Sequence, residues 1–207
     1  MDNFIKKGLT IILFASLMVL SNRCGVVQQT QQMANLVKCD FRVASVQNIT
    51  LAGVNIQNIR SVQDLKNLNF MDYAKIMAAV AGSNLPLSLQ LNIEGKNPNT
   101  SPAGMNQLDW ILLIDNIQMT TGSINNRFTI PPNNGTTIIP LQISLNLKQV
   151  LSGKSLDAIA NFAFNLAGIG NKPTRITAKV KPTIMIGQTP LTYPGYITIN
   201  TEFSGIR

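Results

Sequence analysis

The feature that most constrains the fold of this 207-residue chain is a strict alternation of apolar and polar residues from Leu85 to Ile93. Because successive side chains of a β-strand point to opposite faces of its sheet, this period of two predicts a strand with one buried face. A second stretch, from Thr136 to Leu147, alternates in the same way. The chain should therefore fold around antiparallel sheets that each bury one face.

The rest of the chain extends this pattern. Residues 108–119 are apolar on both faces, which predicts a strand in the interior of a sheet. Residues 156–168 have helical spacing and should form a helix capped by Ser155. Turn residues separate the other strands that we expect, at residues 41–48, 54–59, 124–130, 175–186 and 196–203. Seven or eight short strands with one or two short helices predict an all-β fold, a β-sandwich of a single domain.

Residues 64–81 have the spacing of an amphipathic helix. Asp72 is placed to cap the stretch 73–81, and Gly82 can end it in the left-handed conformation. A helix that binds a membrane surface is one interpretation, but its polar side carries only one cation, Lys75. We therefore expect this helix to pack on the sheet.

Residues 1–23 predict export. Two lysines precede a twelve-residue apolar run that ends at Leu20, which is too short to span a bilayer comfortably and is typical of a signal peptide. Cys24 follows, as at the site where bacterial lipoproteins are processed and acylated, although Arg23 directly before it departs from that pattern. We expect a lipid anchor on Cys24. The alternative is a leader that is cleaved elsewhere or retained, with Cys24 as a bystander.

Residues 24–40 connect this leader to the predicted sandwich at residues 41–207. They are rich in glutamine, and we expect a flexible tether, with a first helical turn as the alternative. If Cys24 is acylated, Cys39 has no partner for an intramolecular disulfide; if Cys24 is free, a Cys24–Cys39 bridge is open in an oxidising compartment. We expect Cys39 to be a small buried hydrophobic residue.

The composition excludes several kinds of chemistry. The chain has no histidine, which excludes Ser-His-Asp and Cys-His nucleophiles and nearly every metal site with nitrogen ligands. Its net charge of +8 comes from scattered cations, so we expect no nucleic-acid partner. We expect no catalytic residue, no cofactor and no metal, because the carboxylates after the leader form no paired motif: Asp40, Asp64, Asp72, Glu94, Asp109, Asp115, Asp157 and Glu202.

Five features in order resemble the late-embryogenesis-abundant group 2 family, also called the LEA14-like or WHy domain. They are the helix at residues 72–76, the strand start Leu85-Pro86-Leu87, the tripeptide Asn97-Pro98-Asn99, the Ile130-Pro131 turn with Gly135, and the strand from Ile138 to Leu147 with Leu151 after it. The resemblance implies an immunoglobulin- or fibronectin-III-like antiparallel sandwich, a link to stress and desiccation tolerance, frequent export in bacteria and no known catalytic residue. For Asn97, Pro98 and Asn99 we expect a structural role, because asparagine side chains can satisfy the backbone groups of a loop.

These observations favour a non-enzymatic module of the cell envelope, facing the periplasm or the cell surface. It would be held at a membrane by its N-terminal lipid anchor and would bind protein or lipid partners that the sequence does not identify. The alternative is a binder or carrier of lipid or another apolar ligand, with an acyl chain between the sheets. The residues that would then surround the ligand are Leu87, Leu89, Trp110, Leu112, Ile143 and Phe164. We expect a closed core instead, because leucine and isoleucine pack well between two sheets.

Overall fold

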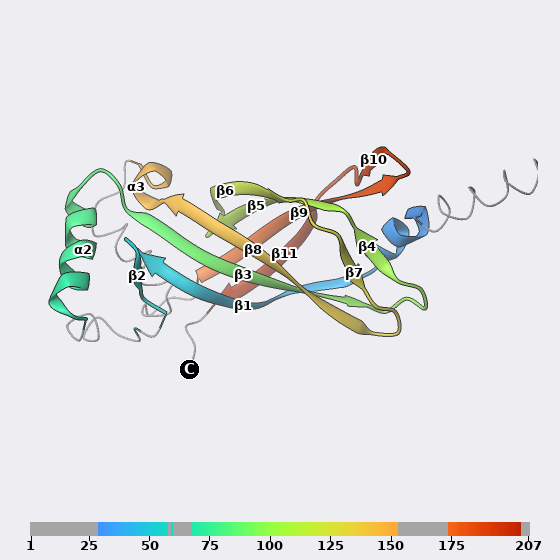
Figure 1. The fold of residues 1–207 in the computed structure, drawn as a ribbon, viewed down its shortest axis with the longest axis horizontal. Coiled ribbons are helices and arrows are strands. Elements are labelled where there is room, and N and C mark those ends of the chain that lie inside the picture. Colours follow the sequence, from blue (N-terminus) through green and yellow to red (C-terminus); the bar gives the residue numbers. More distant parts are fainter. Residues whose placement is uncertain (1–28, 58, 60–67, 153–173, 204–207) are drawn as a thin grey trace, which may run out of the picture.

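The computed structural model describes residues 29–57, 59, 68–152 and 174–203, which form a β-sandwich of two antiparallel sheets (Figure 1). The expected all-β sandwich is therefore confirmed. One sheet has the order β2-β1-β3-β8, with β1 at Asp40–Leu51, β2 at Val54–Asn55, β3 at Pro86–Asn97 and β8 at Gly135–Asn146. The other has the order β10-β9-β5-β6, with β5 at Gln107–Ile114, β6 at Ile117–Ile124, β9 at Thr174–Ile186 and β10 at Thr189–Thr192; β11 at Ile197–Phe203 also pairs with β9. A separate two-stranded sheet joins β4 at Ala103–Met105 to β7 at Phe128–Ile130.

The strand predicted at residues 85–93 lies in the middle of the first sheet. It is β3, which pairs with β1 on one side and with β8 on the other. Its apolar side chains point into the core, and the buried ones are Leu87, Leu89, Leu91 and Ile93. The pairing with β8 runs without a bulge along the whole strand. Alternation predicted the buried face correctly, because a shift by one residue would have exposed all of these side chains.

The single interior strand predicted at residues 108–119 is wrong, because the chain turns in the middle of it. β5 ends at Ile114 and β6 begins at Ile117. Asp115 and Asn116 lie between them with φ angles of 48° and 64°. Positive φ at both central residues is the geometry of a type I′ turn, whose twist matches that of an antiparallel hairpin. The strand expected at residues 124–130 is shortened in consequence, and only Phe128–Ile130 form β7.

Short strands raise the number above the expected seven or eight, and eleven lie within the described residues. Of the strand expected at residues 54–59, only β2 forms. Ala52 and Gly53, with φ angles of 51° and 78°, make the turn that joins it to β1. The long β9 pairs with β11 along its first half and with β10 along its second half, so one edge of this strand has two successive partners.

The core lies between the two sheets, and one close contact limits which residue can stand opposite its largest side chain. Trp110, the only tryptophan in the chain, is buried and pairs with Gly122 of β6. A Cβ atom at Gly122 would lie 2.6 Å from Cε2 of the indole ring. Only glycine therefore leaves room for Trp110 in its present position.

Helix α2, Phe70–Ala81, forms where the helical spacing predicts it, but both of its ends differ from the prediction. Asn69 is the N-cap, because its Oδ1 accepts a 2.8 Å hydrogen bond from the Asp72 backbone N–H, and its Nδ2 donates to Asp72 Oδ2 at 2.9 Å. Asp72 is therefore a residue of the first turn and not the cap. Gly82 has φ −73° and ψ −167°, so the left-handed ending is also wrong. The rest of the helical prediction lies outside the described residues: residues 64–67, the cap Ser155 and residues 156–168.

The two ends of the elongated sandwich carry different helices (Figure 1). α2 lies at one end and contacts β2, rather than packing across the face of a sheet as expected. Residues 29–36 are helical and lie at the opposite end. For these residues the expected tether is wrong and the helical alternative holds, while residues 24–28 lie outside the described residues. We call these ends the α2 end and the asparagine end, the latter after the residues that hold helical segment 29–36.

Candidate functional site

The turn Asn97-Pro98-Asn99 ends β3 at the asparagine end, and its first side chain is fully buried. Asn97 Nδ2 donates to the carbonyl oxygens of Ser101 at 3.0 Å and Ile130 at 3.1 Å. Its Oδ1 accepts two hydrogen bonds from Asn99, one from the backbone N–H at 3.0 Å and one from Nδ2 at 2.6 Å. Every hydrogen-bonding group of this buried amide is satisfied, which the burial of a polar side chain requires.

A third asparagine connects this turn to helical segment 29–36. Asn35 is 3% exposed, and its Nδ2 donates to the carbonyl oxygens of Ser101 at 3.3 Å and Pro102 at 3.1 Å. In the opposite direction, Asn99 Nδ2 donates to the Asn35 carbonyl oxygen at 3.0 Å. Gln31 Nε2 donates to Asn35 Oδ1 at 3.0 Å, which orients the Asn35 amide. Three side chains thus form one network, the asparagine cluster: Asn35, Asn97 and Asn99.

The turn between β7 and β8 lies against the same cluster. Asn133 and Asn134 have φ angles of 57° and 65°. Their backbone N–H groups donate to the carbonyl oxygens of Asn99 and Asn97, both at 2.8 Å. A Cβ atom at Gly135 would lie 2.7 Å from the carbonyl oxygen of the residue that opens this turn, Pro131, so glycine is required there. Two features of the family resemblance, the Asn97-Pro98-Asn99 turn and the Ile130-Pro131 turn with Gly135, are separate in the sequence. They form one structural unit here.

Apolar contacts hold helical segment 29–36 as well. Met33 and Leu36 are buried in the core. Cys39 is a free, buried cysteine whose Sγ donates to the Asn35 carbonyl oxygen at 3.4 Å. Burial raises the pKa of the Cys39 thiol to about 11, and the negative charge of Asp40 adds to this increase. The small buried role expected for Cys39 is confirmed, while its possible partner Cys24 lies outside the described residues.

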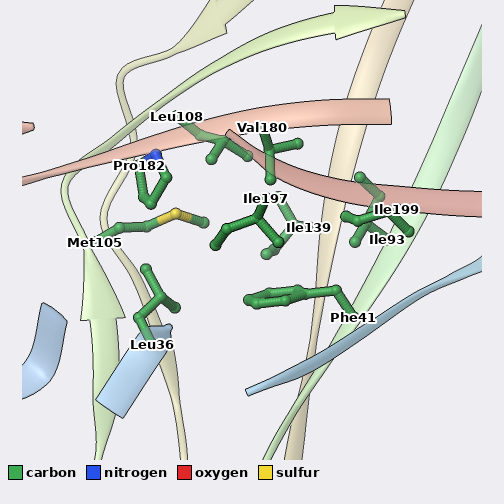
Figure 2. Close-up of a pocket in the computed structure, with 10 residues that line it drawn as sticks. All are labelled: Leu36, Phe41, Ile93, Met105, Leu108, Ile139, Val180, Pro182, Ile197 and Ile199. Carbon is green, nitrogen blue, oxygen red and sulfur yellow. The ribbon is translucent and has the colours of Figure 1, made fainter. Parts of the chain in front are cut away.

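A small cavity lies between the sheets beside this segment (Figure 2). Its walls are apolar and come from both sheets: Leu36, Phe41, Ile93, Met105, Leu108, Ile139, Val180, Pro182, Ile197 and Ile199. The centre of a water-sized sphere can move through about 10 Å³ of it, which is about the room of one water molecule. Sites for small-molecule ligands occupy about 300 to 1,000 Å³, so this cavity does not accommodate an acyl chain.

The residues expected around an acyl ligand do not surround this cavity. They are buried in the core without lining it: Leu87, Leu89, Trp110, Leu112 and Ile143. Phe164, the sixth, lies outside the described residues. The described part of the core is therefore filled by its own side chains where the carrier alternative would place a ligand.

The α2 end presents apolar side chains to solvent. Ile76 is the buried residue of α2. Large apolar side chains on the rest of the helix are between 45% and 82% exposed: Phe70, Met71, Tyr73 and Met77. The short helix α3, Leu147–Val150, lies near its C-terminus, where Lys148 Nζ donates to the carbonyl oxygens of Val80 and Gly82. Buried Ile76, the partly buried Ala79 and Val80, and a few polar contacts thus attach α2.

Five carboxylates of the described residues have individual structural partners. Salt bridges join Glu94 to Arg42 at 2.8 Å, Asp72 to Lys75 at 3.0 Å and Glu202 to Arg175 at 3.4 Å. The hydrogen bond from Lys75 holds the pKa of the Asp72 carboxyl below its ordinary value. Asp109 accepts from Ser123 and Gln107, and Asp115 accepts from the Arg175 backbone. Within the described ranges, no group of three or more cysteine, aspartate or glutamate side chains is placed to hold a metal ion.

The structure brings together part of what the sequence singled out and adds residues that it did not. Asn97 and Asn99 meet in one network, whereas Cys24, Asp64 and Asp157 lie outside the described residues. Sequence reasoning missed Asn35 and Gln31. Their only signal was the spacing of Met33 and Leu36, which is helical but covers less than two turns.

No helix in the described part of the chain is long and apolar enough to cross a membrane.

Comparisons with known proteins give no family for this chain. No family model matches the sequence, and no curated protein matches it. A crystal structure of a protein from Archaeoglobus fulgidus is similar, with 19% identity, a TM-score of 0.35, and coverage of 57% of this chain and 84% of that one. The solution structure of a candidate late embryogenesis abundant (LEA) protein has 11% identity, a TM-score of 0.37, and coverage of 95% and 89%. The solution structure of a protein from Arabidopsis thaliana has 10% identity, a TM-score of 0.33, and coverage of 56% and 69%.

Proposed function

We propose that this chain is a non-enzymatic lipoprotein of the cell envelope, in which an LEA type 2-like β-sandwich acts as an interaction module in stress or desiccation tolerance. The observation that carries the proposal is the position of Asn97-Pro98-Asn99. This motif of the family resemblance is the centre of the asparagine cluster, which holds the segment that follows Cys24 in the chain. The family motif therefore lies at the end of the molecule that holds helical segment 29–36, the described segment nearest to Cys24 in the chain.

The anchor is supported by the leader and by the position of Cys24 directly behind it. Metabolic labelling with an alkyne fatty acid, in a bacterial host that processes lipoproteins, tests it. We expect the wild type to be labelled and Cys24→Ser to be unlabelled. Cys39→Ser is the matched control and should keep the label, because the Cys39 thiol is buried in the folded protein. Equal labelling of Cys24→Ser and the wild type would contradict the anchor.

A non-enzymatic role is supported by the carboxylates, which form salt bridges and turn contacts with individual partners, and by the complete lack of histidine. A role in stress tolerance is tested by drying cells of the native host that lack the gene. Survival should be restored by the wild type and less well by Cys24→Ser. Unchanged survival of the deletion strain would remove the stress role while leaving the anchor to its own test.

The carrier alternative is tested with a soluble form that lacks residues 1–24. We expect no saturable uptake of a fluorescent fatty acid, because the cavity between the sheets has room for only about 10 Å³. Val180 lines this cavity and is buried. Stoichiometric uptake that Val180→Phe abolishes would make the carrier function the better one.

A further inference from the structure

The length of chain between the anchor and the described structure is short. Gln29 is the first described residue, five positions after Cys24. A fully extended chain spans at most about 3.5 Å per residue, so these five steps reach no further than about 17 Å. Whatever conformation residues 25–28 adopt, Gln29 stays within this distance of an acylated Cys24.

Helical segment 29–36 stays bound to the sandwich while the asparagine cluster is intact. Its Asn35 makes hydrogen bonds to the turn after β3, and Leu36 is buried between the sheets. Gln29 Oε1 also accepts a 3.2 Å hydrogen bond from the Gly187 backbone N–H, in the turn between β9 and β10. Three separate parts of the sandwich thus fix the direction from which the anchor reaches the domain.

We infer that the asparagine end is the surface of this protein that lies against the lipid headgroups, and that the α2 end points away from the membrane. This inference rests on the proposed function, because it requires attachment at Cys24. The surface consists of helical segment 29–36, the turns at residues 98–102 and 131–134, and the β9–β10 turn.

The shape of the molecule determines how far apart the two ends are held. β3 runs from the α2 end to the asparagine end and contains twelve residues (Figure 1). At about 3.3 Å per residue its eleven steps span about 36 Å.

The charge beside the asparagine end is compatible with anionic headgroups. The ranges that make up this surface contain no charged side chain; Lys38, Asp40 and Lys96 lie next to them in the chain, and both lysines are exposed and without a salt bridge among the described residues.

Energy transfer to the bilayer tests this orientation. A donor dye is attached to Thr100→Cys at the asparagine end or to Ser83→Cys at the α2 end, two exposed polar positions on either side of β3. Cys24 is blocked by acylation and Cys39 is buried, so each variant carries one reactive thiol. The full acylated chain is reconstituted in phosphatidylethanolamine–phosphatidylglycerol vesicles with an acceptor on the headgroups. We expect much higher transfer from position 100 than from position 83.

A variant with a longer linker tests whether the short chain between Cys24 and the sandwich causes the difference in energy transfer. Insertion of about 20 glycine and serine residues after Gly25 gives a chain whose ends are separated by about 25 Å on average, without changing the sandwich. The difference between positions 100 and 83 should then shrink. Equal transfer from both positions in the chain without the insertion, or higher transfer from position 83, would overturn the inference.

Failure of the anchor and failure of the orientation give different results. Mass spectrometry of the purified chain reports whether Cys24 is acylated. If it is not, the proposed anchor fails, and the orientation is measured on a Cys24→Ser form in which residues 1–23 are replaced by a hexahistidine tag bound to nickel-chelating lipid. Higher transfer from position 100 there supports the inference about the surface, and equal transfer overturns it.

Discussion

The two ends of this sandwich are built on different principles, although each combines helical residues with the turns beside them. At the asparagine end, the Asn97 and Asn35 side chains are buried and make hydrogen bonds to the backbone of the turn at residues 98–102 and of Ile130. At the α2 end, the helix buries Ile76, half-buries Val80 and exposes four large side chains: Phe70, Met71, Tyr73 and Met77. A buried amide network requires one particular geometry, whereas a helix attached by a few apolar side chains can shift at lower cost. We therefore expect the asparagine end to share the stability of the core and the α2 end to open locally.

The largest effect should come from Asn97→Ala. This change removes four hydrogen bonds, one of them to the carbonyl oxygen of the buried Ile130, so we expect the free energy of unfolding to fall by about 3 to 5 kcal/mol. Urea unfolding followed by Trp110 fluorescence measures it. Asn84→Ala, an exposed asparagine near α2, is the control and should change stability by less than about 0.5 kcal/mol. Similar values for both variants would mean that the cluster does not stabilise the fold.

Truncation of one apolar residue at each end sharpens the comparison. Leu36→Ala should lower the free energy of unfolding by about 2 to 5 kcal/mol, because the side chain is 1% exposed and its removal leaves a cavity. Met77→Ala on α2 should cost less than about 1 kcal/mol, since its side chain is 46% exposed. The same denaturant curves compare both variants. A larger loss of stability for Met77→Ala would mean that the α2 end contributes more to the stability of the fold than the asparagine end does.

Removal of the α2 cap should act on one end alone. Asn69→Ala loses the hydrogen bonds to Asp72 and should destabilise the helix by about 1 kcal/mol. Hydrogen exchange is the appropriate measurement, because we expect faster exchange of α2 amides with no change for Asn99 or Asn134. If the amides of the asparagine end exchanged faster as well, the two ends would belong to one cooperative unit.

The smallest effect on stability should come from Phe70→Ser. Its side chain is 82% exposed, so the free energy of unfolding should change by less than about 0.5 kcal/mol. Binding of a dye that reports exposed apolar surface should nevertheless decrease, since Phe70 is the most exposed of the large side chains on α2. Unchanged dye binding together with a clear loss of stability would show that Phe70 packs against the protein.

Local periodicity predicted those parts of the fold in which a long segment repeats one rule. Leu87 to Ile93 follow the period of a strand, and both the strand and its buried face are correct. The hairpin turn at Asp115 and Asn116 was missed, because apolar residues on both sides of it obscured the two turn residues. The structural role of Asn97 was expected, but its link to Asn35 was not. Asn35 and Asn99 are 64 positions apart, and pairing at that separation has no local signal in the sequence.

The buried thiol of Cys39 allows the opening of the asparagine end to be timed. Burial raises the pKa of this thiol to about 11, so the reactive thiolate is rare at pH 7, and its sulfur is held against the Asn35 carbonyl oxygen. We therefore expect a thiol reagent to react with Cys39 mainly while helical segment 29–36 is detached from the sandwich. The rate of that reaction, divided by the rate for the unfolded chain, gives the fraction of time that the segment is detached. The reaction of Cys39 thus reports how often helical segment 29–36 detaches. Detachment would let the domain move further from an anchor at Cys24.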